Sequence, residues 1–170
     1  MSIELLVLDV DGTLTDGKIV YTNDNKELKV FDVKDGLAIV SWRKLGKKVA
    51  IITGRESEIV KKRAKELGVD YLVQKSSNKK EALEEILKKE KLSWQNVAVV
   101  GDDINDYHIL KNSQLSFAVN NATIYAKEAA KITLSKSGGD GAVREAIEYL
   151  IEYEGLKKRF LELWGVESSE

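Results

Sequence analysis

The sequence predicts an α/β fold in which helices cover both faces of a parallel sheet. Short runs such as 5–8 and 97–100 are apolar at every position, and they alternate with segments whose apolar residues have helical spacing. Continuous apolar runs are typical of strands that are buried on both faces, as the strands of parallel sheets are. The pattern indicates a Rossmann-like sheet, and a chain of 170 residues fits one domain spanning 1–170.

A β-hairpin is expected directly after the first strand. Two short extended runs, 18–21 and 27–31, flank a polar turn at 22–26, which is a pattern typical of hairpins. A helix should follow, with Asp35 near its N-cap and Gly46 at its C′ position, because the apolar residues between them have helical spacing.

The rest of the chain continues the alternation of strands and helices. The expected elements are strand 49–52, helix 56–67, strand 71–73, a helix around 82–87, strand 97–100, helix 107–110, strand 115–119, helix 125–129, strand 132–134 and helix 142–153. The tail from Gly155 onward has Leu156, Phe160, Leu163 and Trp164 at helical spacing. We therefore expect the tail to pack on the chain's own core or on another subunit.

Composition narrows the classes of function. The 27 basic and 28 acidic residues give a net charge of -1, so no global field would attract nucleic acid or acidic membranes. The chain has no cysteine and one histidine, which leaves oxygen atoms as the metal ligands. The first strand begins within a few residues of the N-terminus and no apolar run approaches membrane-spanning length, so a cytoplasmic protein is expected.

Two carboxylates, Asp9 and Asp11, follow the first strand, and we predict that they belong to a site. In an extended chain, residues two apart point to the same side, and Gly12 lets the backbone turn away. Like charges this close repel unless a cation or a shared proton neutralises them, and two carboxylates beside a turn carbonyl suit Mg²⁺. The simpler alternative is a pair of solvated acids in a turn.

Polar residues also follow two later strands. Ligands bind outside the carboxyl ends of the strands in open parallel sheets, so these residues should converge on the first two acids. They are Thr53, Gly54 and Arg55 after the second buried strand, Gly101, Asp102, Asp103 and Asp106 after the third, and Lys79 at the start of the helix between them. Acids, a hydroxyl, a helix N-terminus and a lysine predict a metal site beside an anion site, as phosphoryl transfer requires.

Each of these residues also has a structural interpretation. Thr53 could be only a helix N-cap, and Lys79 could lie on the solvated face of a lysine-rich helix. Asp103 and Asp106 could simply complement a helix dipole. His108 is expected to be structural.

The ordered motifs resemble those of the haloacid dehalogenase (HAD) superfamily of phosphohydrolases over nearly the full length of the chain. They are Asp9-Val10-Asp11-Gly12-Thr13, Thr53-Gly54-Arg55, Lys79 and Gly101-Asp102-Asp103-x-x-Asp106. The hairpin and the segments 33–36 and 138–145 are similar to those of a capless branch, the 3-deoxy-D-manno-octulosonate 8-phosphate phosphatases. Lys34 and Asp140 depart from the arginine or other basic residue of many relatives, and this bears on the substrate.

The resemblance implies an HAD-like fold without a cap domain and Mg²⁺-dependent hydrolysis of a sugar phosphate, namely 3-deoxy-D-manno-octulosonate 8-phosphate of lipopolysaccharide biosynthesis. It implies that Asp9 attacks phosphorus and forms an aspartyl-phosphate, that Asp11 protonates the leaving alcohol and then activates water, and that Lys79 neutralises charge. The implied ligands of Mg²⁺ are Asp9, the backbone carbonyl of Asp11, and Asp102, with Asp103 and Asp106 in supporting positions.

The resemblance further implies that Thr53, Gly54 and Arg55 bind the phosphate, and that Lys34 and Arg144 contact the rest of the substrate. Without a lid, a single subunit would leave its site open to water. The family resemblance implies a homotetramer, in which neighbouring subunits complete each other's sites.

Three alternatives remain open from the sequence. The substrate could be another sugar acid phosphate, such as a nine-carbon 9-phosphate. The chain could instead be a signalling receiver domain that accepts phosphate on an aspartate, or a scaffold that keeps the fold without chemistry.

Overall fold

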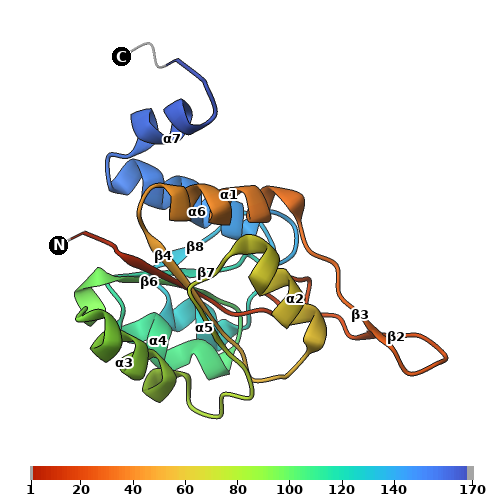
Figure 1. Cartoon of the computed structure of the whole chain (residues 1–170). Helices are drawn as coiled ribbons and strands as arrows, with labels where there is room; N and C mark the ends of the chain where they lie inside the picture. Colours follow the sequence, from red (N-terminus) through yellow and green to blue (C-terminus); the bar gives the residue numbers. More distant parts are fainter. Residues whose placement is uncertain (1, 168–170) are drawn as a thin grey trace.

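A six-stranded parallel sheet forms the centre of the fold (Figure 1). The computed structural model describes residues 2–167, so residues 1 and 168–170 of the expected domain and tail lie outside the described part. The spatial order is β5-β4-β1-β6-β7-β8. The strands are β1 (Leu5–Leu8), β4 (Lys48–Ile52), β5 (Tyr71–Val73), β6 (Val97–Gly101), β7 (Leu115–Ala118) and β8 (Ile132–Thr133). The predicted fold class is confirmed, and these strands lie within one residue of their expected bounds.

Helices cover both faces of the sheet. The residues of β1 are all apolar because both faces of this strand are packed against hydrophobic side chains. Leu6 and Leu8 pack in one hydrophobic cluster, whereas Leu5 and Val7 pack in a second cluster on the opposite face. Alternate side chains of a strand point to opposite faces, so both faces need apolar residues. The first cluster includes residues of α1 (Val33–Lys44), α2 (Glu58–Leu67) and α6 (Ala142–Tyr153). The second includes residues of α3 (Lys79–Glu90), α4 (Tyr107–Asn112) and α5 (Ile124–Ala129).

The start of α1 differs from the prediction. Asp32, not Asp35, is its N-cap, because the Asp32 carboxylate accepts hydrogen bonds from the backbone N–H groups of Lys34 (2.7 Å) and Asp35 (3.3 Å). Asp35 lies inside the first turn and is buried. The helix ends as predicted, with Gly46 following the cap at a φ of 90°.

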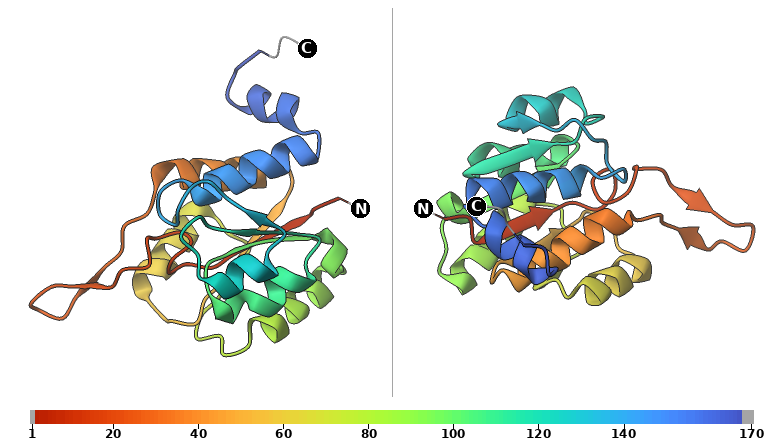
Figure 2. Two further views of the ribbon diagram at one scale, coloured as in Figure 1. Left: turned by 180° about the vertical axis from the view of Figure 1, so that it is seen from behind. Right: turned by 90° about the horizontal axis from the view of Figure 1, so that it is seen from above.

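The predicted hairpin is present but is paired over a shorter length than expected. Strands β2 (Val20–Tyr21) and β3 (Glu27–Leu28) pair antiparallel and project away from the sheet and helices (Figures 1 and 2). Apolar side chains of the hairpin, including Ile19, Val20, Tyr21 and Val30, are exposed. The hairpin is therefore held without a core of its own.

The C-terminal tail packs on the chain itself. It forms α7 (Lys157–Leu163), and Leu156 and Phe160 pack against the first hydrophobic cluster. Trp164 Nε1 donates a hydrogen bond to Ser41 Oγ of α1 at 3.0 Å. No helix within residues 2–167 is both long and apolar enough to cross a membrane.

Candidate active site

Most of the predicted residues that follow the strands meet in a cleft at the carboxyl edge of the sheet. The register explains this convergence, because Leu8 of β1 pairs with Ile51 of β4 and with Val100 of β6, so all three strands end side by side. The cleft has a volume of about 270 Å³. It is lined by Asp9, Asp11, Gly17, Thr53, Gly54, Arg55, Asp102, Asp103 and Asn105. Gly17 and Asn105 were not anticipated.

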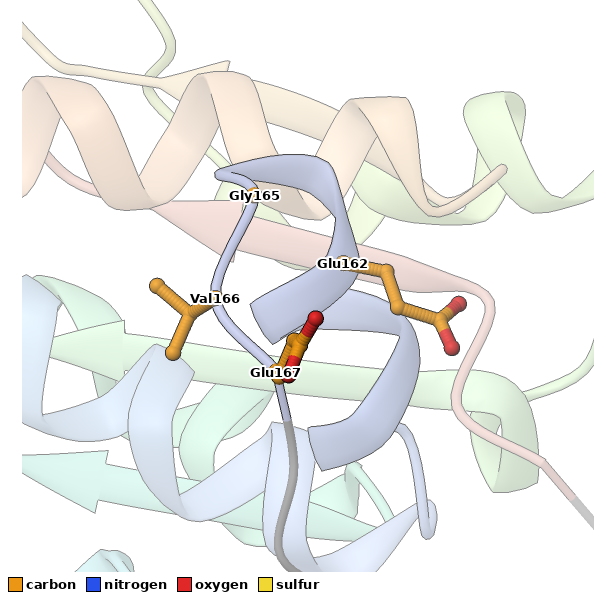
Figure 3. Close-up of a pocket in the computed structure, with 4 residues that line it drawn as sticks. All are labelled: Glu162, Gly165, Val166 and Glu167. Carbon is orange, nitrogen blue, oxygen red and sulfur yellow. The ribbon is translucent and has the colours of Figure 1, made fainter.

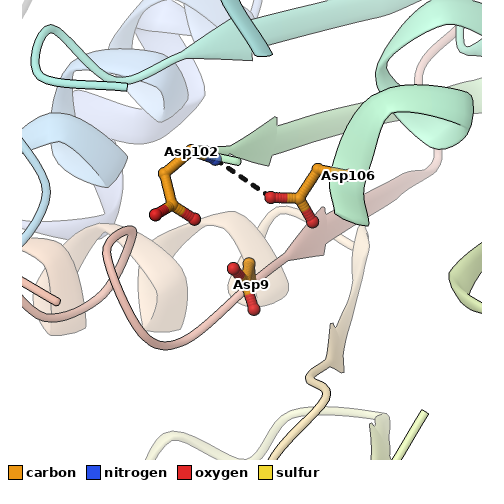
Figure 4. Close-up of side chains that lie close together, drawn as sticks. All are labelled: Asp9, Asp102 and Asp106. Carbon is orange, nitrogen blue, oxygen red and sulfur yellow. Dashed lines mark hydrogen bonds between the residues drawn. The ribbon is translucent and has the colours of Figure 1, made fainter. Parts of the chain in front are cut away.

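Three carboxylates form a cluster at this cleft, and two of them, Asp9 and Asp102, line it. Oxygen atoms of Asp9, Asp102 and Asp106 lie within 4.8 Å of one another (Figure 4). Asp9 and Asp106 are buried, and Asp102 is half-buried. An oxygen-only ligand set of this kind suits Mg²⁺.

Asp106 has a different environment from the other two acids. Its Oδ2 accepts a hydrogen bond from the backbone N–H of Asp102 at 3.0 Å (Figure 4). The same oxygen accepts from the backbone N–H of Asp103 at 3.4 Å, and Asp106 Oδ1 lies 2.7 Å from Lys79 Nζ. Both of its oxygens are thus engaged by protein donors, so Asp106 holds the loop and the lysine in place. Asp9 and Asp102 are left with carboxylate oxygens that can face a cation.

Gly12 is required for the position of Asp102. A Cβ atom on Gly12 would lie 1.9 Å from Asp102 Oδ2, and Gly12 has a φ of 92° that other residues rarely adopt. Gly138 also approaches this turn closely, because a Cβ atom added to Gly138 would lie 1.9 Å from the Gly12 carbonyl oxygen. The 138–141 loop therefore packs directly on the turn that carries the first motif.

Lys79 is part of the acid cluster and not of a solvated helix face. Its side chain is 2% exposed, and Nζ lies 2.9 Å from Asp9 Oδ1 and 2.7 Å from Asp106 Oδ1. Burial acts to lower the pKa of Lys79, but the Asp9 and Asp106 carboxylates outweigh it and raise the pKa above its usual value. Lys79 therefore stays charged between the two acids.

The cluster holds three carboxylates and one lysine, and this excess of acids affects the pKa values of Asp102 and Asp106. Burial, followed by the Asp9 carboxylate, raises the pKa of Asp102. Burial and Asp9 also raise the pKa of Asp106, against the opposing effect of Lys79. A divalent cation would relieve this repulsion, so the donor set fits the predicted metal.

Asp11 lies in the cleft but outside the acid cluster. Its Oδ1 is 2.6 Å from Nζ of Lys29, a hairpin residue that the sequence analysis missed. Lys29 Nζ also lies 2.9 Å from Glu27 Oε1, and the same Glu27 oxygen lies 3.3 Å from Arg55 Nη1. Alternation along 27–31 places Glu27 and Lys29 on one face, but it does not reveal which face turns toward the site.

The residues after β4 differ in their surroundings. Thr53 is buried at the end of the strand and does not cap α2, whose N-cap is Ser57. The N-cap alternative for Thr53 is therefore wrong. Gly54 and Arg55 both line the cleft, and Arg55 Nη1 also lies 3.3 Å from Glu27 Oε1.

Lys34 and Arg144 do not line the cleft. The Arg144 side chain contacts Glu148 and the Lys34 carbonyl oxygen, and its backbone N–H donates to Asp35 Oδ1 at 2.8 Å. Both residues lie at the N-terminal ends of their helices. Their contact with substrate stays a prediction. His108 is exposed and its ring packs edge-on against Tyr107, and its structural role stays a prediction.

Two other hollows lie near the C-terminal helix. One, of about 390 Å³, is lined by Glu162, Gly165, Val166 and Glu167 (Figure 3). The other, of about 490 Å³, includes Tyr149 and Phe160 in its lining. Neither is lined by the motif residues that follow the strands, so the cleft at the sheet edge is the candidate active site.

A parallel sheet with buried acids, a buried lysine and a threonine–glycine turn at its carboxyl edge defines a class of protein, the metal-dependent enzymes that act on phosphate groups.

The comparisons with known proteins narrow this class. The protein-family model described as haloacid dehalogenase-like hydrolase matches residues 71–147 of this chain. The 3-deoxy-D-manno-octulosonate 8-phosphate phosphatase of Escherichia coli (strain K12) is 41% identical over 154 residues, which cover 91% of this chain and 82% of the relative. The Haemophilus influenzae phosphatase of the same name is 33% identical over 159 residues, covering 94% and 88%.

A solved structure agrees with these relatives. The Moraxella catarrhalis 3-deoxy-D-manno-octulosonate 8-phosphate phosphatase, in complex with magnesium ion, phosphate ion and KDO, superposes with a TM-score of 0.92 at 34% identity, covering 95% of this chain and 93% of that chain. The chain thus belongs to the haloacid dehalogenase-like hydrolases and, within them, to the family of the 3-deoxy-D-manno-octulosonate 8-phosphate phosphatases.

Proposed function

We propose that this chain is a Mg²⁺-dependent phosphomonoesterase whose substrate is 3-deoxy-D-manno-octulosonate 8-phosphate. Relatives that align over most of both chains carry that name, and one was solved with magnesium, phosphate and KDO. The observation that carries the proposal is the position of Asp9. Its carboxylate lies at the edge of the cleft, 2.9 Å from Lys79 and beside Asp102 and Asp106.

In the first half-reaction, Asp9 is the nucleophile. Lys79 holds Asp9 Oδ1, so the other oxygen is free to form a bond to phosphorus as the bond from phosphorus to the sugar oxygen breaks. Asp11 gives a proton to that leaving oxygen. The products of this step are the sugar and an aspartyl-phosphate on Asp9.

In the second half-reaction, Asp11 is the base. It takes a proton from a water molecule, which attacks phosphorus, and the bond between phosphorus and Asp9 breaks. Inorganic phosphate leaves, and Asp9 and Asp11 return to their starting protonation states. Thr53, Gly54 and Arg55, at the end of β4, bind the phosphate oxygens throughout.

The metal would be held by Asp9, Asp102 and the backbone carbonyl of Asp11, with Asp103 and Asp106 supporting them. When bound, it supplies positive charge that offsets the phosphate and the crowded carboxylates. Asp106 supports the site through the Asp102 and Asp103 backbone N–H groups, to which it is already bonded.

We also propose that the chain acts as a cytoplasmic homotetramer built of single-domain subunits. The exposed apolar residues of the projecting hairpin support this assembly, because Val30 is 76% and Tyr21 is 62% exposed in the single chain. Neighbouring subunits would cover these residues and border the open clefts. A fully active monomer in sedimentation experiments would contradict the assembly.

Phosphate release tests the proposed function. The purified chain is expected to release phosphate from 3-deoxy-D-manno-octulosonate 8-phosphate when Mg²⁺ is present and to stop when the metal is chelated. A nine-carbon sugar acid 9-phosphate is the comparison substrate. Faster release from the nine-carbon substrate would contradict the proposed substrate, and release that survives chelation would contradict the metal requirement.

A further inference from the structure

Two hairpin residues, Lys29 and Glu27, contact residues that line the cleft. Lys29 lies between Leu28 and Val30, which are 50% and 76% exposed, yet its own side chain is 2% exposed. Its Nζ lies 2.6 Å from Asp11 Oδ1. Within residues 2–167, no other donor is within hydrogen-bond distance of the Asp11 carboxylate.

Lys29 belongs to a chain of alternating charges that joins three segments. Asp11 from the β1 turn contacts Lys29, Lys29 contacts Glu27 of β3 at 2.9 Å, and Glu27 contacts Arg55 after β4 at 3.3 Å. The carboxylates of Asp11 and Glu27 both contact the Lys29 ammonium and fix its position, and Arg55 in turn pairs with Glu27.

We propose that Lys29 is a positioning residue for Asp11, the acid and base of the reaction. The contact fixes Oδ1 and the side-chain orientation, which leaves Oδ2 as the oxygen that carries and accepts the proton. This inference rests on the proposed function and deepens it, because it makes the hairpin part of the acid–base machinery of its own subunit.

The proposal predicts an effect that depends on the leaving group. A sugar alkoxide is a strong base and needs the proton from Asp11, whereas p-nitrophenolate leaves readily without one. General acid–base catalysis contributes about 10²- to 10⁴-fold in rate, so a loosened Asp11 should lose a part of that, on the order of tenfold. Formation of the aspartyl-phosphate from p-nitrophenyl phosphate should be nearly unaffected.

The test compares Lys29→Met with Lys29→Arg and with a control on the same hairpin. Lys26→Met is the control because the Lys26 side chain is 77% exposed and, among residues 2–167, its Nζ forms an ion pair only with Asp24, at 3.7 Å. For Lys29→Met we expect kcat on the sugar phosphate to fall about tenfold or more while KM changes less than about threefold. The single-turnover burst of p-nitrophenolate should stay within about threefold of the parent, because it needs no acid. Lys29→Arg should recover most of the lost rate, and Lys26→Met should match the parent.

Other results would overturn the inference. An equal loss with both leaving groups, an unchanged kcat, or a Lys29→Arg variant no better than Lys29→Met would each show that Lys29 does not position the acid. Thermal unfolding of each variant identifies a folding defect. If Lys29→Met does not fold, Glu27→Gln carries the test, because it weakens the hold on Lys29 and should show the same leaving-group dependence in smaller measure. A parent chain that cleaves neither substrate would contradict the proposed function itself.

Discussion

Asp35→Asn should change how the stability of this protein depends on pH. Asp35 is buried in the first turn of α1, where its Oδ1 accepts a hydrogen bond from the Arg144 backbone N–H. Its Oδ2 has no hydrogen-bond partner among the described residues, 2–167. Burial raises the pKa of Asp35 from 3.8 to about 6, with Asp32 adding to the effect and the Arg144 contacts opposing it. The folded state therefore holds this proton more tightly than the unfolded state.

The sign and size follow from this difference. Below the unfolded pKa the carboxyl is neutral in both states, and no penalty applies. As pH rises from 3.8 through about 6, Asp35 ionises first in the unfolded state, and the free energy of unfolding falls. The total decrease is about 3 kcal/mol, because each unit between the two pKa values contributes about 1.4 kcal/mol. About 1 kcal/mol of this is already present at pH 4.5, so about 2 kcal/mol appears between pH 4.5 and pH 8.

Urea unfolding at these two pH values measures the effect. The asparagine side chain keeps an oxygen for the Arg144 N–H but cannot ionise, so the variant should gain about 2 kcal/mol relative to the parent on going from pH 4.5 to pH 8. Protein concentration is held fixed, because assembly would shift apparent stability. Asp140→Asn, at an exposed aspartate in the neighbouring loop, is the control and should show no such change. A stability difference between Asp35→Asn and the parent that is the same at both pH values would refute the reasoning.

Three further predictions concern the site itself. Lys79→Met should destabilise the fold by about 3–5 kcal/mol in urea unfolding, because it leaves the buried Asp9 and Asp106 without their cation; a loss below about 1 kcal/mol would contradict the burial argument. Gly12→Ala should weaken Mg²⁺ binding in calorimetry at least tenfold, because the added Cβ atom would lie 1.9 Å from Asp102 Oδ2. Gly46→Ala is the control for backbone strain, because Gly46 has a similar φ of 90° but open space around it. This control should bind Mg²⁺ like the parent. Asp11→Asn should leave the fold intact and lower phosphate release at least 100-fold, as loss of the acid and base implies; turnover within about threefold of the parent would remove Asp11 from that role.

The sheet could be predicted from sequence because its strands are buried on both faces. Leu5 to Leu8 must be apolar throughout, and such a run has few other interpretations in an alternating pattern. The convergence of Asp9, Thr53 and Asp102 followed from the rule that parallel strands end at one edge.

Contacts that depend on how a loop folds back could not be predicted. Asp32 and Asp35 both lie near the start of α1 and both residue types can cap a helix, so only the folded backbone shows that Asp32 is the N-cap. Lys29 lies in a hairpin whose side chains are otherwise largely exposed, and nothing local identifies Asp11 as its partner. Asp106 was predicted to support the metal site. The distances place its carboxylate in the acid cluster, where one oxygen accepts from the Asp102 backbone N–H and the other contacts Lys79 Nζ.

Trapping the phosphorylated enzyme tests the central claim most directly. Asp11→Asn should form the aspartyl-phosphate from p-nitrophenyl phosphate but hydrolyse it slowly, since the base is missing, so the intermediate should accumulate. After an acid quench, peptide mass spectrometry is expected to find one phosphoryl group on Asp9, and none in an Asp9→Asn/Asp11→Asn double variant. Steady phosphate release without a phosphoryl group on Asp9, or a phosphoryl group that persists in the double variant, would contradict the mechanism.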